Sequence, residues 1–147
     1  IHTPGHASNH LCFLIKDTKC LLTGDHIMDG STVVIGPPDG NMKSYINSLE
    51  KLLDFDIDCF APGHGNYIHE PEKTIQSIIR HRLTRERKAL RKLGEAGISS
   101  LDKLTELVYD DVSEMLHPIA KYSLEAHLLK LIDEKKVKLD KDLFEIV

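Results

Sequence analysis

Three short motifs, each beside a predicted strand, most constrain what this chain can fold into: Thr3-Pro4-Gly5-His6, Gly24-Asp25 and Pro62-Gly63-His64-Gly65. Glycine lets the backbone turn tightly, so a neighbouring histidine or aspartate side chain projects from the loop. One histidine beside a glycine is more often structural than a ligand, but the three motifs together predict a metal site. Neutral imidazole and carboxylate suit zinc or another divalent first-row metal, and a carboxylate can bridge two ions.

Short β-prone runs alternate with helical patterns in the first half of the chain. Residues 10–15 and 20–23 predict a hairpin, 31–35 and 58–61 predict further short strands, and 42–54 predict an amphipathic helix. Pro71 opens a longer helical pattern that reaches about Leu93, and Gly94 and Gly97 end it.

Beyond Gly97 the pattern is helix, helix and then a β-hairpin. Ser99 is placed to cap the first of these helices, with Asp102 near its start, and Pro118 opens the second. Residues 136–147 alternate around a turn as a hairpin does. Together with the long helix before them, these elements have the order of a winged-helix module, so we expect an α+β protein.

Composition narrows the class of protein. The 147 residues are 41% hydrophobic and 29% charged, which excludes a disordered chain, and no apolar run approaches the roughly 18 residues that span a bilayer. The three cysteines lie in apolar surroundings with no Cys-x-x-Cys spacing. They fit reduced thiols, so we expect a cytoplasmic protein. The lack of a long apolar run leads us to expect no membrane partner.

One segment is strongly basic. Residues 80–92 hold seven basic residues and one acidic residue, whereas residues 93–147 hold seven and twelve. Arg85, Arg87 and Lys88 in the basic segment are candidate contacts for a single-stranded RNA backbone, although a solvated helix face is an equally simple interpretation. The acidic tail does not fit a reader of duplex DNA.

The order of the ligand motifs, with 19 residues from His6 to Asp25 and 39 from Asp25 to His64, resembles the second half of the metallo-β-lactamase superfamily. The segments His2–His6, Leu22–Asp25, Ser31–Ile35, Pro37–Gly40, Ala61–Gly65 and His81-Arg82 resemble its endoribonuclease-like lactamase-beta-two subfamily. The resemblance implies that His6 is a ligand of a first zinc ion and His64 of a second. It implies that Asp25 bridges the two ions.

The same resemblance implies a fold and an incomplete site. It implies the C-terminal half of an αββα sandwich over residues 1–85 and a winged-helix domain over 86–147. The family's upstream His-x-His-x-Asp-His motif does not occur in these 147 residues. We therefore expect a fragment that binds zinc weakly or not at all and is inactive alone, because each ion keeps too few protein ligands.

Other residues near the motifs are secondary candidates. His10, His26 and Ser8 could orient the ligands or contact substrate, although structural roles at strand ends and turns are the simpler interpretation. Half of a sandwich should also expose an apolar face and an open strand edge, through which we expect self-association. The candidates for that face are Leu11, Phe13, Ile15, Leu21 and Val33.

Three functions remain open from the sequence. In the first, the full-length protein cleaves single-stranded RNA with a two-metal site, as the subfamily resemblance implies. In the second, the same kind of site hydrolyses a small-molecule thioester, as glyoxalase II does, because fold alone does not fix the substrate. In the third, the chain is a scaffold or interaction module without activity.

Overall fold

The computed structural model describes residues 1–147 and divides into two compact units, Ile1–His81 and Arg82–Val147. The division falls within the long helix α2 (Pro71–Ala96). The domain ranges expected from the sequence, 1–85 and 86–147, stay a prediction, because a helix that runs through both units marks no linker. None of the helices is both long enough and apolar enough to cross a bilayer.

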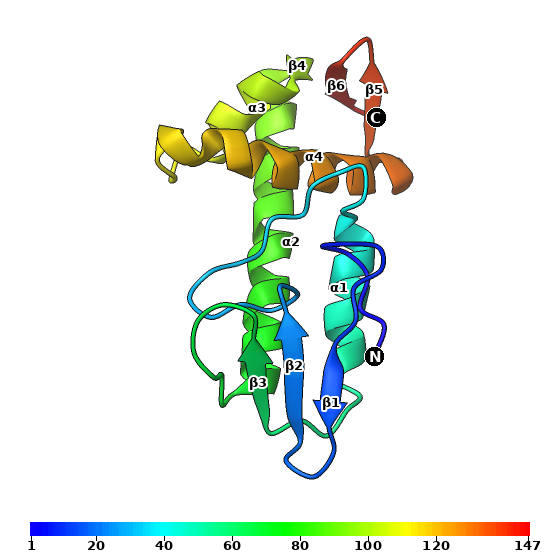
Figure 1. Cartoon of the computed structure of the whole chain (residues 1–147). Helices are drawn as coiled ribbons and strands as arrows, with labels where there is room; N and C mark the ends of the chain where they lie inside the picture. The colour runs from blue at the N-terminus through cyan, green and yellow to red at the C-terminus, as the bar shows by residue number, and fades with distance from the viewer. The chain divides into compact units, whose positions relative to one another are not determined.

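The first unit is built on a three-stranded sheet in the order β1-β2-β3 (Figure 1). Its strands are β1 (Phe13–Ile15), β2 (Cys20–Gly24) and β3 (Cys59–Pro62). β1 pairs with β2 in antiparallel fashion, as the predicted hairpin requires, and β2 pairs with β3 in parallel. The expected strand over residues 31–35 is wrong: this segment has no regular structure.

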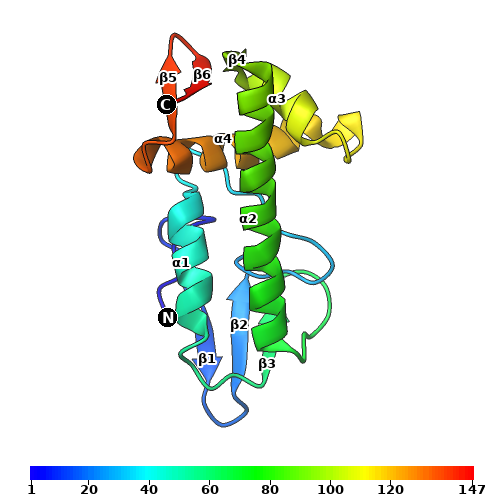
Figure 2. The same cartoon turned by 180° about the vertical axis from the view of Figure 1, so that it is seen from behind.

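Helix α1 (Met42–Leu52) and the first turns of α2 lie on one face of this sheet (Figure 2). The side chain of Asn41 caps α1 by accepting a hydrogen bond from the Ser44 backbone N–H. The apolar stripe of α1 and the inward residues of the strands, Leu21 and Phe60, form the core of the unit, and both of these strand residues are fully buried. Burial of these apolar side chains under the helices stabilises the unit.

The other face of the sheet is apolar and exposed. Leu11, Phe13 and Ile15 are each 45% exposed or more, as expected. The expectation was wrong for Leu21 and Val33, which are buried. Side chains alternate along a strand, so Leu21 points to the helices while its neighbour Leu22 is exposed.

The second unit has the expected winged-helix order. It contains β4 (Ser99–Ser100), α3 (Leu101–Val108), the 3₁₀ turn η1 (Glu114–Leu116), α4 (His117–Asp133), β5 (Val137–Asp140) and β6 (Leu143–Ile146), with a sheet in the order β4-β6-β5. Its core gathers residues from α2, α3, α4 and the wing, including Leu93, Leu104, Leu124, Leu128 and Phe144.

The boundaries of these elements follow from local chemistry. Ser100, not Ser99, caps α3: its hydroxyl accepts a hydrogen bond from the Lys103 backbone N–H, although both serines pair with β6 in the small sheet. The helix expected to stop near Leu93 runs to Ala96, where Gly97 ends it with φ +71°. The wing turns through Lys141 and Asp142, both with positive φ, as two-residue hairpin loops require.

Candidate functional site

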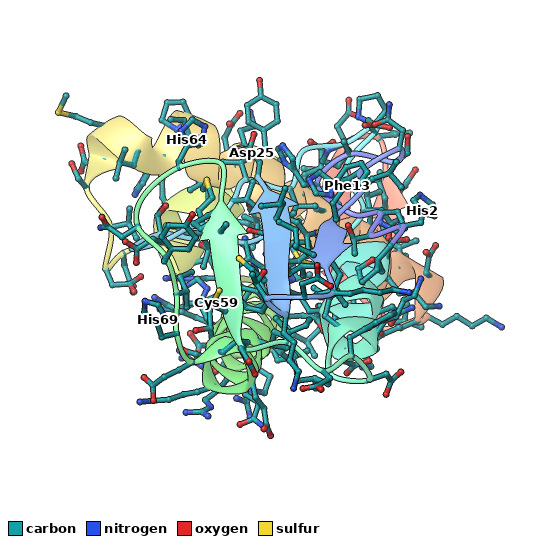
Figure 3. All side chains as sticks on the ribbon, turned by 60° about the horizontal axis from the view of Figure 1, so that its bottom comes forward. His2, Phe13, Asp25, Cys59, His64 and His69 are labelled. Atoms are coloured by element: carbon teal, nitrogen blue, oxygen red, sulfur yellow. The ribbon has the colours of Figure 1, made fainter.

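Parallel pairing of β2 and β3 brings Asp25 and His64 together at the C-terminal ends of these two strands. Asp25 directly follows β2 and His64 lies two residues after β3, and parallel strands end at the same side. The Nε2 atom of His64 lies 3.4 Å from Oδ1 of Asp25. Figure 3 shows both side chains beyond the ends of their strands. The His64 side chain is 74% exposed and the Asp25 side chain 45%, so a ligand can reach both.

Two glycines allow this approach. Gly24 has φ +51°, a conformation that glycine adopts without strain, and it turns the chain from β2 toward Asp25. The Gly63 N–H donates to the Gly24 carbonyl over 2.9 Å. A Cβ atom on Gly63 would lie 3.2 Å from the Gly24 carbonyl carbon and 3.3 Å from Oδ1 of Asp25, so a larger residue would force one of the two loops to shift by a few tenths of an ångström.

One ring nitrogen of His6 is hydrogen-bonded to the backbone. Its Nδ1 lies 2.8 Å from the Val34 carbonyl oxygen, and a carbonyl only accepts hydrogen bonds, so Nδ1 carries the proton. The lone pair is then on Nε2. This tautomer, fixed by a backbone carbonyl, is the one that metal-binding histidines commonly adopt.

His10 and His26 form a packed pair behind these groups. The ring centroids are 5.5 Å apart in a stacked arrangement, and the His26 ring meets Tyr45 edge-on at 5.0 Å. Nδ1 of His10 lies 2.9 Å from Oγ1 of Thr3. These contacts hold both rings within the unit, which fits the structural role expected for them.

Burial lowers the pKa of both rings. Desolvation, and then the neighbouring His10 and His6, lowers the pKa of His26 to about 3. Burial also lowers the pKa of His10; His6 adds to this and Asp25 opposes it. The His26 ring is fully buried and neither of its nitrogens has a hydrogen-bond partner. The backbone carbonyl of His26 accepts a hydrogen bond from the Tyr45 hydroxyl at 2.9 Å, which anchors the segment next to Asp25.

Ser8 joins two loops. Its backbone N–H donates to Oδ2 of Asp39 at 3.1 Å, and hydrogen bonds from the Ser8 side chain and backbone lower the pKa of Asp39. Asp39 belongs to the proline- and glycine-rich segment that follows Ile35. Ser8 therefore connects the loop of His6 to this segment, as a turn residue does.

Two of the three candidate RNA contacts on α2 make internal ion pairs. Arg85 donates to Asp111 over 2.7 and 3.1 Å and to the Val108 carbonyl, and its guanidinium stacks on Tyr109. Lys88 pairs with Asp110 and Asp111. Arg87 is exposed and bonds to the Thr84 hydroxyl. Contact of these residues with RNA stays a prediction, and the pairing of Arg85 and Lys88 weakens its basis, because their charges are already neutralised.

Comparison with known proteins identifies the family of this chain. The family model described as the Metallo-beta-lactamase superfamily matches residues 1–64, and that of the Beta-lactamase associated winged helix domain matches residues 100–145. Beta-lactamase-like protein 2 homolog of Drosophila melanogaster is 34% identical over 143 residues, which cover 96% of this chain and 47% of that protein. The chain belongs to the metallo-β-lactamase superfamily.

The chain is also similar to a thioesterase and to a protein of known crystal structure. The Atrochrysone carboxyl ACP thioesterase of Aspergillus chevalieri is 30% identical over 152 residues, covering 95% of the chain and 47% of the relative. A crystal structure of a metallo-beta-lactamase family protein from Thermus thermophilus matches the whole chain and 48% of its own, with a TM-score of 0.87 at 22% identity, which establishes the fold. The chain spans about half the length of the curated relatives it matches.

The superfamily implies a metal, and the residues present fit part of such a site. The fixed tautomer of His6 and the Asp25–His64 approach are the donor chemistry that a divalent metal requires. Nowhere in the 147 residues, however, do three or more histidine, cysteine, aspartate or glutamate side chains gather closely enough to hold an ion. The two side chains that approach each other here, Asp25 and His64, are too few to complete a zinc site by themselves.

Two groups that hold the candidate site in place were not predicted from the sequence. The Val34 carbonyl that fixes His6 comes from a segment 28 residues away, and no pattern in the sequence pointed to it. Tyr45 was also missed, although a tyrosine on the buried face of a predicted helix signals that its hydroxyl needs a partner.

Proposed function

We propose that the full-length protein is a metal-dependent hydrolase to which this chain contributes His6, Asp25 and His64. The observation that carries the proposal is the 3.4 Å approach of His64 Nε2 to Asp25 Oδ1 at the ends of two parallel strands. It is supported by membership of the superfamily and by the tautomer of His6. Zinc, as two ions that share Asp25, is the metal we expect.

Each of these residues has a task that its surroundings support. A bound divalent metal supplies Lewis acidity toward a carbonyl or phosphoryl oxygen. His6 presents Nε2 as an electron-pair donor because Nδ1 is committed to Val34. Asp25 offers two acceptor oxygens from a loop that Gly24 and Gly63 hold against the His64 loop. The exposure of Asp25 and His64 leaves their donor atoms open to a substrate.

A thioester is the substrate class we favour. Two relatives from Aspergillus species carry the name Atrochrysone carboxyl ACP thioesterase, at 30% identity each. The basic segment that had supported RNA is partly neutralised by Asp110 and Asp111. RNA cleavage remains the second candidate, supported by the exposed Arg80 and Arg87.

The test is hydrolysis by the full-length protein of an acyl thioester, carried on acyl carrier protein or coenzyme A, and of labelled single-stranded RNA, each with and without a chelator. We expect chelator-sensitive thioester hydrolysis that falls at least about 100-fold in Asp25→Asn and His64→Ala variants. Asp17→Asn, in the turn between β1 and β2, is the matched control and should keep its activity.

The remaining outcomes separate the alternatives. RNA cleavage that needs metal, with no thioester turnover, would replace our choice of substrate. A metal-loaded protein that cleaves neither would support the scaffold interpretation. A cytoplasmic location stays a prediction that fits the three free cysteines.

A further inference from the structure

Two cysteines face each other on the side of the first sheet that the helices leave uncovered. Cys20 begins β2 and Cys59 begins β3, and the two are register partners in the parallel ladder. Directly opposed residues on neighbouring strands point to the same face, and the strands lie about 4.7–4.9 Å apart. Disulfides form across Cα–Cα distances of about 4.4–6.8 Å, so the backbone spacing of neighbouring strands lies within the range that a disulfide spans.

The two thiols of this pair differ in their exposure to solvent. Both cysteines are free, Cys20 is 8% exposed and Cys59 is more accessible. Burial, and then a hydrogen bond with the Cys59 thiol, raises the pKa of Cys20 to about 11. A protonated thiol is a poor nucleophile, so Cys20 reacts slowly by itself, and the more accessible Cys59 is the sulfur that an oxidant meets first.

Cys12 is the third cysteine, and its surroundings differ. It is fully buried, and its Sγ lies 3.3 Å from Oγ1 of Thr3 and 3.9 Å from the Thr23 carbonyl. Burial raises the pKa of Cys12, with the hydrogen bond from Thr3 opposing that change. Cys12 has no cysteine partner in register, so in an oxidation experiment it is the control thiol that should stay reduced.

We propose that Cys20 and Cys59 are an oxidisable dithiol that closes into a disulfide between β2 and β3 when it meets a low-molecular-weight disulfide such as oxidised glutathione. The Cys59 thiolate attacks one sulfur of the oxidant; its S–S bond breaks, and one glutathione leaves as a thiolate that takes up the proton. The Cys20 thiolate then attacks Sγ of Cys59 and releases the second glutathione. Two protein thiols are oxidised and one glutathione disulfide is reduced.

This bond would connect the strands that carry two site residues. Asp25 follows Cys20 by five residues, and His64 follows Cys59 by five. Figure 3 shows Cys59 on β3 and His64 beyond the end of that strand. The disulfide would therefore fix β2 against β3 beneath Asp25 and His64. The proposal does not depend on the hydrolase assignment, because its readout is covalent.

The experiment treats the reduced 147-residue chain, in which this face of the sheet is uncovered, with oxidised glutathione from about pH 7 to about pH 9; free thiols are then alkylated and peptides mapped by mass spectrometry without reduction. We expect a linked peptide that joins Cys20 to Cys59, faster formation at higher pH, and alkylated Cys12. Treatment with a dithiol reductant should remove the link.

Three variants make the result decisive. Cys12→Ser should still form the link. Cys20→Ser should stop after the first step and keep glutathione on Cys59, whereas Cys59→Ser should form neither product. Absence of the Cys20–Cys59 peptide in protein whose circular dichroism is native would overturn the proposal, as would preferential linkage of Cys12.

Discussion

The space available to a single Cβ atom controls the contact between Asp25 and His64. A methyl group on Gly63 would press on Gly24 and on the carboxylate of Asp25, while the same change at Gly94 meets nothing within 4 Å. Gly63→Ala should therefore separate the two loops and lower the metal affinity of the full-length protein about 10- to 100-fold, the range found when groups that support ligands are lost.

The measurement is metal binding by calorimetry, with Gly94→Ala as the control. That control lies inside α2 and should leave metal affinity unchanged while stabilising the helix by about 0.4–1 kcal/mol. Equal metal affinity in Gly63→Ala and wild-type protein would mean that the close approach of the loops has no role in binding.

Only part of the candidate site could be predicted from the sequence. Histidine and aspartate beside glycine at strand ends indicated His6, Asp25 and His64. The partners that fix them, the Val34 carbonyl and Tyr45, come from distant segments, so they depend on tertiary structure. Likewise, the opposing Asp110 and Asp111 could not be matched to Arg85 and Lys88 before the path of the chain was known.

Alternation along β2 gives a direct test at the scale of the element. Leu21 is fully buried under the helices and Leu22 is 41% exposed. Leu21→Ala should lower the free energy of unfolding by about 2–5 kcal/mol, because it leaves a cavity in the core. Leu22→Ala should change it by much less, about 0.5 kcal/mol. Urea unfolding measures both, and similar losses would contradict the assigned orientation.

The winged-helix unit contains a buried ionic cluster that predicts a pH response. His127 is fully buried, its Nδ1 lies 3.1 Å from Oε2 of Glu86, and Lys130 reaches the other oxygen at 2.7 Å. Burial lowers the pKa of His127, while Glu86 opposes that change and Arg82 and Lys130 add to it. Below the ordinary value of 6.5, the unfolded chain therefore takes up a proton that the folded chain refuses.

The stabilising contribution of His127 is thus present above about pH 6.5 and decreases as the pH falls below it, by at most about 1.4 kcal/mol per pH unit. His127→Gln keeps an amide donor near Glu86 but cannot titrate. The difference in unfolding free energy between wild type and this variant should change between about pH 7 and about pH 5. A constant difference would contradict the account.

Element boundaries show where sequence patterns were sufficient. Helical spacing, the helix-opening Pro118 and the wing turn predicted the second unit, because its helices bury continuous apolar stripes. Residues 31–35 look like a strand from their side chains, yet they have no regular structure. Strand formation needs a pairing partner, and β-branched composition alone does not supply one.

At the scale of the molecule, the apolar face of the first sheet favours self-association of the 147-residue chain, which stays a prediction. Phe13 is 60% exposed on β1, and β1 is an edge strand of its sheet. Phe13→Ser should shift the chain toward monomer in sedimentation velocity at high concentration. Leu139→Ser, at a half-exposed position of the wing, should not. A wild-type chain that is monomeric at high concentration would contradict the prediction.

The central claim is that His6, Asp25 and His64 are one part of a metal-binding set. The most direct measurement is the metal content of full-length protein, by elemental mass spectrometry after equilibration with zinc, beside Asp25→Asn and the Asp17→Asn control. We predict about two zinc ions per chain in wild type and control, and the loss of at least one in Asp25→Asn. Unchanged zinc content in Asp25→Asn, with the fold intact, would contradict the claim.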